Sequence, residues 1–161
     1  MQVGLKVWRY NARSGERELK TLLDRPTGER PWKIRDELGE SMLENFGVFR
    51  SEDKMLRQRE ILQELRERYR NVYVEDKGEV FNSDLTQAIE LGNMLDTALC
   101  MIEGGIWRKE SRGAHSRPTD YPKRDDENFM VHSITRWRDD RVELSTSSVR
   151  VTKWEPEERK Y

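Results

Sequence analysis

Apolar residues recur at helical spacing through most of the first two thirds of the chain. From Ser14, three leucines fall on one helical face, and the sequence RPTGERP that follows ends this short helix with two prolines and a glycine. A second helix is predicted from Pro31, which suits the first helical position, to Gly47, a natural C-cap. Its apolar positions are Trp32, Ile34, Leu38, Met42 and Phe46.

A third, strongly amphipathic helix is predicted to begin after Ser51, a good N-cap that is followed by two acidic residues in the first turn. Its apolar stripe consists of Met55, Leu62, Leu65 and Tyr69. The remaining face alternates arginine and glutamate, a pattern more typical of a solvated surface with ion pairs than of a nucleic-acid contact.

The longest helix is predicted after a connector at residues 73–80, with Asn82, Ser83 or Asp84 as its cap. Its apolar positions are Leu85, Ile89, Leu95, Leu99, Ile102 and Ile106. The sequence also places Gly92, Gly104 and Gly105 in it, each costing about 1 kcal/mol relative to alanine. We therefore expect another backbone to approach closely there; the alternative is a helix that ends at Gly104.

Beyond the fourth helix, residues 110–128 are polar and show neither helical nor strand periodicity. The segments FMVHSITRW, RVELSTS and SVRVTKW then predict three short antiparallel strands, with a turn at the sequence RDD. The fold class is therefore mainly α: an antiparallel three-helix bundle, a long irregular loop and a small antiparallel β element. We divide the chain into an extended lead-in and short helix (1–30), the bundle (31–112), and the loop with its β and extended tail (113–161).

Composition limits what this domain could bind. Only 34% of the 161 residues are hydrophobic and 38% are charged, which predicts a thin core. Thirty Lys and Arg nearly balance 31 Asp and Glu, so no net field favours nucleic acid or an acidic membrane. No apolar run is long enough to span a membrane, and the single cysteine suits a reducing compartment, so we expect a cytoplasmic chain. No glycine-rich phosphate loop is present, so we expect no cofactor in this chain.

Candidate chemistry concentrates in the irregular loop, where arginines and lysines alternate with acidic residues. A metal site would use His115, Asp120, Asp125 and His132, but their spacing matches no ligand pattern. An acid–base site would pair His115 with Asp120, and an anion site would use the arginines as bidentate clamps. We favour a fourth interpretation, in which these side chains pair with each other and with the carbonyl groups of the loop.

The run ESRGAHSR, followed by DYPKRDDENF and a histidine, closely resembles the signature near the end of the flavoprotein subunit of succinate dehydrogenase and fumarate reductase. The segments RPTGERPWKIRDELGESMLENFGVFRSED and VFNSDLTQAIELGNMLDTA resemble the helical domain of the same subunit, and VTKWEPEERKY resembles its tail. The resemblance covers residues 19–161. L-aspartate oxidase has a related helical domain, but RDDEN and WEPEERKY are nearer to the succinate dehydrogenase pattern. Pro118 and Thr119 make the loop one residue longer than is usual in the family.

The resemblance implies an accessory C-terminal domain that buttresses a flavin-binding domain. The parent would oxidise succinate to fumarate, with hydride passing to FAD and electrons to an iron–sulfur subunit, at the inner face of the cell membrane. Its FAD and dicarboxylate ligands precede the helical domain, so we expect no catalytic, cofactor-binding or metal residues here and an inactive isolated chain. The alternatives are a free-standing helical interaction module and the equivalent domain of an L-aspartate oxidase-like enzyme. Contacts with the flavin-binding and capping domains are expected from Arg112, His115, Arg117, Asp120, Arg124 and Asp125.

Overall fold

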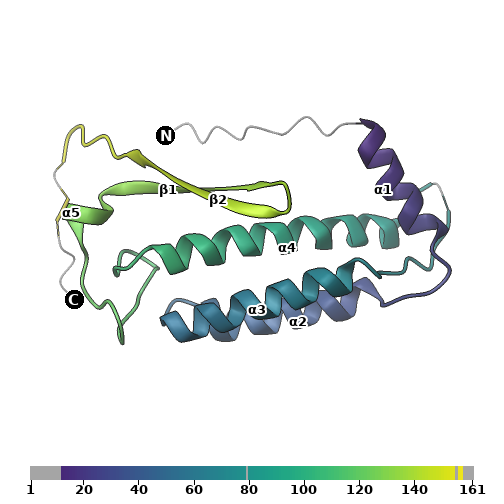
Figure 1. Ribbon diagram of the computed structural model, residues 1–161, viewed down its shortest axis with the longest axis horizontal. Coiled ribbons are helices and arrows are strands. Elements are labelled where there is room, and N and C mark those ends of the chain that lie inside the picture. Colours follow the sequence, from purple (N-terminus) through teal and green to yellow (C-terminus); the bar gives the residue numbers. More distant parts are fainter. Residues whose placement is uncertain (1–11, 79, 155, 158–161) are drawn as a thin grey trace.

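Three long helices and a two-stranded hairpin make up most of the computed structural model, which describes residues 12–78, 80–154 and 156–157 (Figure 1). The expected lead-in at residues 1–9 and the last four residues of the tail lie outside the described residues. The elements are α1 (Ala12–Asp24), α2 (Pro31–Phe46), α3 (Glu52–Tyr69), α4 (Ser83–Trp107), α5 (Asp126–Phe129), β1 (Val131–Arg138) and β2 (Arg141–Ser148).

Helices α2, α3 and α4 form the predicted antiparallel bundle, because each presents its apolar stripe to the other two. The core contains all of the leucines assigned to the inner faces of α3 and the second half of α4. Its fully buried large aliphatic residues are Ile34, Met55, Leu62, Leu65, Leu91, Leu95 and Ile102. Helix α1 lies across one end of the bundle and buries Leu22, whereas Leu19 remains 37% exposed.

A buried polar contact also joins α2 to α3. Asn45 donates a hydrogen bond to the Oε1 atom of Gln58 over 2.9 Å, and Gln58 donates to the Oγ atom of Ser41 over 2.9 Å. Gln58 is fully buried and Asn45 nearly so. Buried amides are costly unless paired, so these bonds favour one register of α2 against α3.

Two glycines of α4 make room for aromatic side chains and Gly104 faces the side chain of Thr135, so the expectation that another backbone approaches there is wrong. A Cβ atom on Gly92 would lie 2.6 Å from the hydroxyl of Tyr69, and one on Gly105 would lie 2.6 Å from the ring of Phe46. The helix continues past Gly104 to Trp107, which excludes the shorter alternative. Asn82 caps this helix, and its side chain accepts a hydrogen bond from the Leu85 N–H over 2.7 Å.

Strands β1 and β2 form an antiparallel hairpin that covers α4 on the side opposite to α2 and α3 (Figure 1). The predicted turn is confirmed: Asp139 and Asp140 both have positive φ angles, of 49° and 63°, as a two-residue hairpin turn of type I′ requires. The third predicted strand, at residues 148–154, does not form. Strand β2 continues to Ser148 and the chain makes no turn at residues 149–152, so it does not fold back beside β2.

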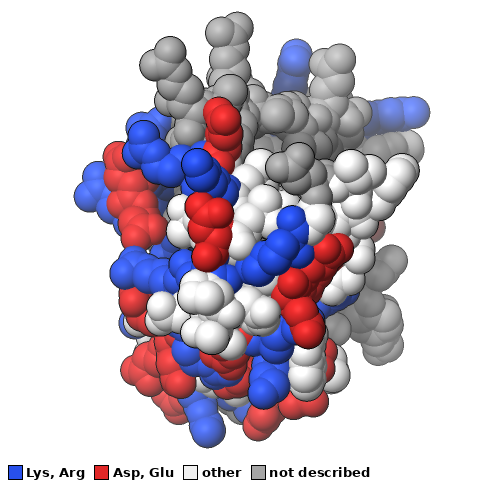
Figure 2. All heavy atoms as spheres, turned by 90° about the vertical axis from the view of Figure 1, so that its right-hand side faces the viewer, with Lys and Arg blue, Asp and Glu red and all other residues white. Residues whose placement is uncertain are grey.

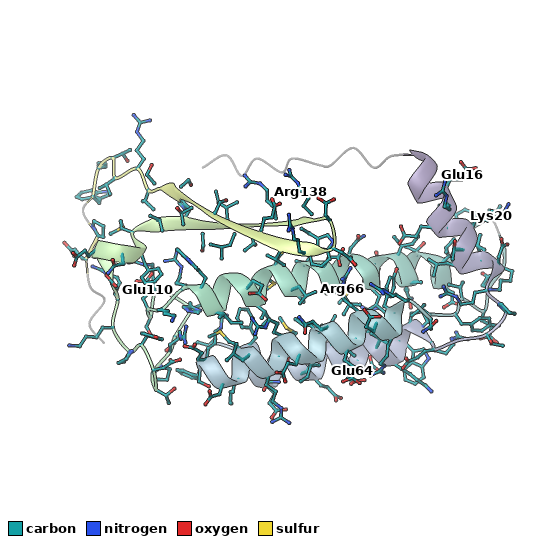
Figure 3. All side chains as sticks on the ribbon, viewed as in Figure 1. Glu16, Lys20, Glu64, Arg66, Glu110 and Arg138 are labelled. Atoms are coloured by element: carbon teal, nitrogen blue, oxygen red, sulfur yellow. The ribbon has the colours of Figure 1, made fainter. Side chains whose placement is uncertain are left out.

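Arg66 of α3 fastens this hairpin to the bundle (Figure 3). It forms ion pairs with Asp96 of α4 over 3.0 Å and with Asp140 in the hairpin turn over 2.9 Å. Its guanidinium group also lies 4.3 Å from the centre of the Trp137 ring, within cation–π distance. One arginine therefore links α3, α4, strand β1 and the hairpin turn.

Acidic and basic side chains are interspersed at the end of the molecule that carries α1 and the α3–α4 connection (Figure 2). This distribution agrees with the near balance of the charged residues in the sequence. No helix in the part of the chain that the structure describes is long and apolar enough to cross a membrane.

Candidate docking site

Residues 108–125, here called the arginine–carboxylate loop, leave the end of α4 and fold back over the same end of the bundle. Arg108 fixes the start of this loop. It is paired with Glu110 and donates hydrogen bonds to the carbonyl oxygens of Phe129 over 3.0 Å and Val131 over 2.7 Å. The end of α4 is thereby tied to the beginning of the hairpin.

Glu110 lies close to the end of α4, near the start of the loop (Figure 3). Its side chain is fully buried. Its carboxylate accepts hydrogen bonds from Arg108, from Arg112 over 2.8 and 3.0 Å, and from the Asp125 N–H over 2.9 Å. Burial alone would raise the pKa of Glu110, but these donors outweigh burial and the pKa is lowered. The buried carboxylate therefore stays ionised and holds the two ends of the loop together.

Arg117 forms a second, equally buried centre. Its side chain has no exposed surface and pairs with Asp120 and, over 3.2 Å, with Glu52 at the start of α3. It also donates to the carbonyl oxygens of Ile106 over 3.4 Å and Arg108 over 3.2 Å. Its guanidinium thus satisfies carbonyl groups at the end of α4, where the helix has no backbone donors left.

Asp120 provides the N-terminal cap of α3 that the sequence assigns to Ser51. The Glu52 N–H donates to the Oδ2 atom of Asp120 over 2.8 Å, whereas the side chain of Ser51 makes no capping bond. Although burial would raise the pKa of Asp120, the bonds from Arg117 and from the backbone lower it. A carboxylate at the positive end of a helix is also favoured by the helix dipole.

Both ring nitrogens of His115 are engaged. Nδ1 lies 2.8 Å from a terminal nitrogen of Arg50, and Nε2 lies 3.0 Å from the carbonyl oxygen of Arg108. Arginine can only donate, so Nδ1 accepts and Nε2 carries the proton that is donated to the carbonyl. Burial, together with the positive charges of Arg50, Arg117 and Arg108, lowers the pKa of His115.

The structure therefore supports internal pairing over the three chemical interpretations of this loop. His115 contacts arginine and a carbonyl group rather than Asp120, so no acid–base pair forms between them. Among the described residues, no three or more His, Cys, Asp or Glu side chains gather as metal ligands would. His132 is exposed on β1. The arginines already bind carboxylates and carbonyl groups of this chain. The structure therefore does not favour the interpretation in which they clamp an external anion.

The remaining candidates lie at the outer edge of the loop. Arg112 bridges Glu110 and Asp126, the latter over 2.6 Å. Arg124 pairs with Asp126 over 2.7 Å and donates over 2.7 Å to the carbonyl oxygen of Glu157 in the tail. Asp125 caps α5, a single helical turn for which the sequence shows no helical periodicity. Arg112 and Arg117 thus find partners within the chain, although a docking role for the outer residues stays a prediction.

Two contributors to the site carry no signal in the sequence. Arg50, in the turn between α2 and α3, stacks 3.8 Å from the centre of the Phe46 ring and binds His115. Its backbone N–H donates to the Ser116 carbonyl over 2.8 Å. Glu52 pairs with Arg117 across 65 positions of sequence. Only proximity in the folded chain identifies such residues.

An apolar surface adjoins the loop. Val48 and Phe49 are 54% and 71% exposed, and Ser116 lies beside them, since its N–H donates to the Val48 carbonyl over 3.2 Å. Large apolar side chains exposed on a hydrogen-bonded backbone are typical of contact with another protein surface. The loop end of the molecule thus combines fixed charges with exposed apolar groups.

The residues from 35 to 161 match the family model described as the fumarate reductase flavoprotein C-terminus. The fumarate reductase flavoprotein subunits of Serratia sp. (strain ATCC 39006) and Escherichia coli (strain K12) are 42% and 41% identical to this chain, over 93% and 91% of its length. A succinate dehydrogenase flavoprotein subunit of Rickettsia bellii is 39% identical over 63% of the chain. The chain spans only 25% of the length of the Serratia and E. coli relatives.

Solved structures agree with the sequence matches. An E. coli quinol fumarate reductase chain superposes with a TM-score of 0.85 at 40% identity, covering 91% of this chain and 26% of that one. A quinol–fumarate reductase with menaquinol molecules gives a TM-score of 0.81 at 40% identity, covering 89% and 25%. The bundle, the arginine–carboxylate loop and the hairpin therefore form a known unit, and this chain belongs to the family of C-terminal domains of fumarate reductase and succinate dehydrogenase flavoproteins.

The pKa shifts at the site predict that stability falls as the pH is lowered from 7.5 to 5.5. His115 has a lowered pKa in the folded state, so below the unfolded value of about 6.5 the unfolded chain binds the extra proton first. Protonation of this one group can lower the free energy of unfolding by up to about 1.4 kcal/mol for each unit of pH. Urea unfolding at several pH values should show the loss, and His115→Gln should flatten it; an unchanged slope in that variant would contradict the assignment.

Proposed function

We propose that this chain is an accessory domain of an FAD-dependent succinate dehydrogenase or fumarate reductase, and that it docks on the flavin-binding domain through its loop end. The family membership supports the parent enzyme, and the arginine–carboxylate loop supports the docking surface. The observation that carries the docking proposal is the exposure of Val48 and Phe49 on a backbone that is hydrogen-bonded to the loop at Ser116. Such preorganisation lowers the entropy cost of association.

FAD would be held by the rest of the parent subunit. Helices α2 to α5 follow Arg30, Ser51, Asn82 and Asp125, so none of them begins after the glycine-rich turn that cradles a dinucleotide phosphate. The starts of these four helices therefore do not fit the phosphates of this cofactor, and we derive no chemical step in this chain. The parent would oxidise succinate or reduce fumarate on its flavin and exchange electrons with an iron–sulfur subunit at the membrane surface.

In this proposal, the role of the chain is to support and position the flavin-binding domain. The bundle presents one end to the flavin-binding domain, and the buried ion pairs of the loop keep that end in a single conformation. Arg112, Arg124 and Asp125 lie at the outer edge of the loop and are partly exposed, as are His115 and Asp120. Arg117 would support the surface from beneath, because its side chain has no exposed area.

A chimera would test this proposal. We would replace the C-terminal quarter of the E. coli flavoprotein with this chain and measure fumarate-dependent oxidation of a reduced dye. The chimera is expected to exceed the activity of the relative truncated at the same point, because the graft restores the buttress. The isolated chain is expected to be colourless and to show no such activity.

Circular dichroism provides the control for folding in this experiment. A chimera whose grafted helices are formed, but whose activity does not exceed that of the truncated relative, would contradict the accessory role. A Phe49→Asp chimera should lose activity while the grafted helices remain folded, because Phe49 is 71% exposed and packs little within this chain. If the Phe49→Asp chimera keeps full activity, docking does not use the loop end.

A further inference from the structure

A second surface, on a different face of the bundle, is an open groove between α2 and α4 with a volume of about 510 Å³. Nine residues line it and define it here as the α2–α4 groove: Leu38, Gly39, Met42, Glu90, Asn93, Met94, Thr97, Ala98 and Met101. No described segment of the chain fills it, since the hairpin packs on the opposite side of α4. It shares no residue with the loop end.

The groove is largely apolar. Met94 and Met101 are 40% and 50% exposed, and the same face of α2 continues to Trp32, which is 52% exposed. Methionine side chains adapt to the shape of a partner, and exposed apolar surface of this kind typically marks a protein contact. The polar residues that line it, Glu90, Asn93 and Thr97, all lie on α4, whereas a small polar ligand is usually held by polar groups that converge from several elements.

Gly39 gives an independent indication of a partner. It lies in the middle of α2, where glycine costs about 1 kcal/mol relative to alanine. A Cβ atom added at Gly39 would meet nothing within 4 Å, unlike those at Gly92 and Gly105. Packing within this chain therefore explains the other two glycines but not Gly39. The glycine leaves space at position 39 for a segment that approaches α2 from outside this chain.

The charge of the groove limits the character of that segment. Glu90 is the only charged residue that lines it, and among the described residues Glu90 forms no ion pair. An apolar segment that covers the groove would reduce the access of water to this carboxylate. The segment would therefore need a lysine or arginine close to Glu90, because removing an unpaired charge from water is costly.

The length of the relatives indicates where such a segment is found. The chain spans about a quarter of the flavoprotein subunits that it resembles, and the match is to their C-terminal part. Three quarters of such a subunit therefore lies outside the unit described here. We propose that the α2–α4 groove receives an apolar segment with a lysine or arginine from that remaining part of the flavoprotein. This inference rests on the proposed function, and it adds a second contact surface.

Photo-crosslinking in the chimera tests the groove directly. A photoreactive phenylalanine analogue would be placed at Met94 in the groove and, as a matched control, at Glu64, which projects from α3 away from the bundle (Figure 3). Mass spectrometry of the products should find peptides from the first three quarters of the subunit joined to position 94, and none joined to position 64. Equal crosslinking from both positions, or none from position 94 in an active chimera, would overturn the groove proposal.

Gly39→Leu gives a second readout. Leucine favours a helix more than glycine does, and position 39 has open space, so the melting temperature of the isolated chain should not fall. In the chimera, the same change should fill the groove and reduce activity by at least about tenfold, the effect of a loss of 1.4 kcal/mol in docking. Glu64→Leu should leave the activity unchanged.

The two proposals fail in different ways. If the chimera without further changes is active and Gly39→Leu has no effect, the groove is not a contact and the accessory role stands. If the folded chimera has no activity above the truncated relative, both the accessory role and the partner assigned to the groove are contradicted.

Discussion

Replacing Arg117 with alanine is expected to lower the free energy of unfolding by about 3 to 5 kcal/mol. The guanidinium is fully buried and binds Asp120, Glu52 and the carbonyl oxygens of Ile106 and Arg108. Its removal would leave the Asp120 carboxylate without its main partner and would take away the hydrogen bond to the Ile106 carbonyl oxygen. The loss should appear as a lower urea midpoint with an unchanged slope, measured by circular dichroism.

Two further variants separate this effect from a general loss of charge. Arg124→Ala removes an arginine from the edge of the same loop, and since its ion pair with Asp126 is partly exposed, the expected cost is below about 1 kcal/mol. Arg117→Lys keeps the charge but not the planar fork, so it should recover only a small part of the loss. Similar losses for Arg117→Ala and Arg124→Ala would show that the buried network is not the source of stability.

Leu62→Ala is expected to destabilise the bundle by about 2 to 5 kcal/mol, because the leucine is fully buried and alanine leaves a cavity among α2, α3 and α4. Leu95→Ala and Leu99→Ala, on the facing surface of α4, should fall in the same range. The same urea titration measures all three. Their effects should not add fully when combined, since the side chains share one core.

Leu19→Ala is the matched control for these core variants. Leu19 also lies on a predicted apolar stripe, but on α1, where it remains 37% exposed. Its replacement should cost less than about half a kcal/mol, as surface substitutions usually do. A Leu62 variant that behaves like the Leu19 variant would mean that the inner face of α3 has been assigned wrongly.

The helices could be predicted from the sequence because their signals are local. The stop after α1, Pro31 at the start of α2, and Asn82 as the cap of α4 each act within a few residues of the element that they delimit. The turn at Asp139 and Asp140 is local in the same way. The signature segments also suffice to indicate the family, which the matches over residues 35–161 confirm.

The tertiary structure decided the partners of the charged residues in the loop. The sequence offers several donors and acceptors within a few positions of each other, so internal pairing could be predicted, but the individual pairs could not. Asp120 rather than Ser51 caps α3, and Arg50 rather than Asp120 binds His115. These contacts join residues 65 or more positions apart.

The same distinction applies to the glycines and to the strands. The sequence shows that Gly39 and Gly105 each weaken a helix, but only the packing shows that a ring fills the space at Gly105 and nothing fills it at Gly39. Alternation favoured a third strand, and the absence of a turn prevented it. Periodicity reports which face of an element is apolar, whereas the partner of that face is set by how the whole chain folds, and the structure alone determines it.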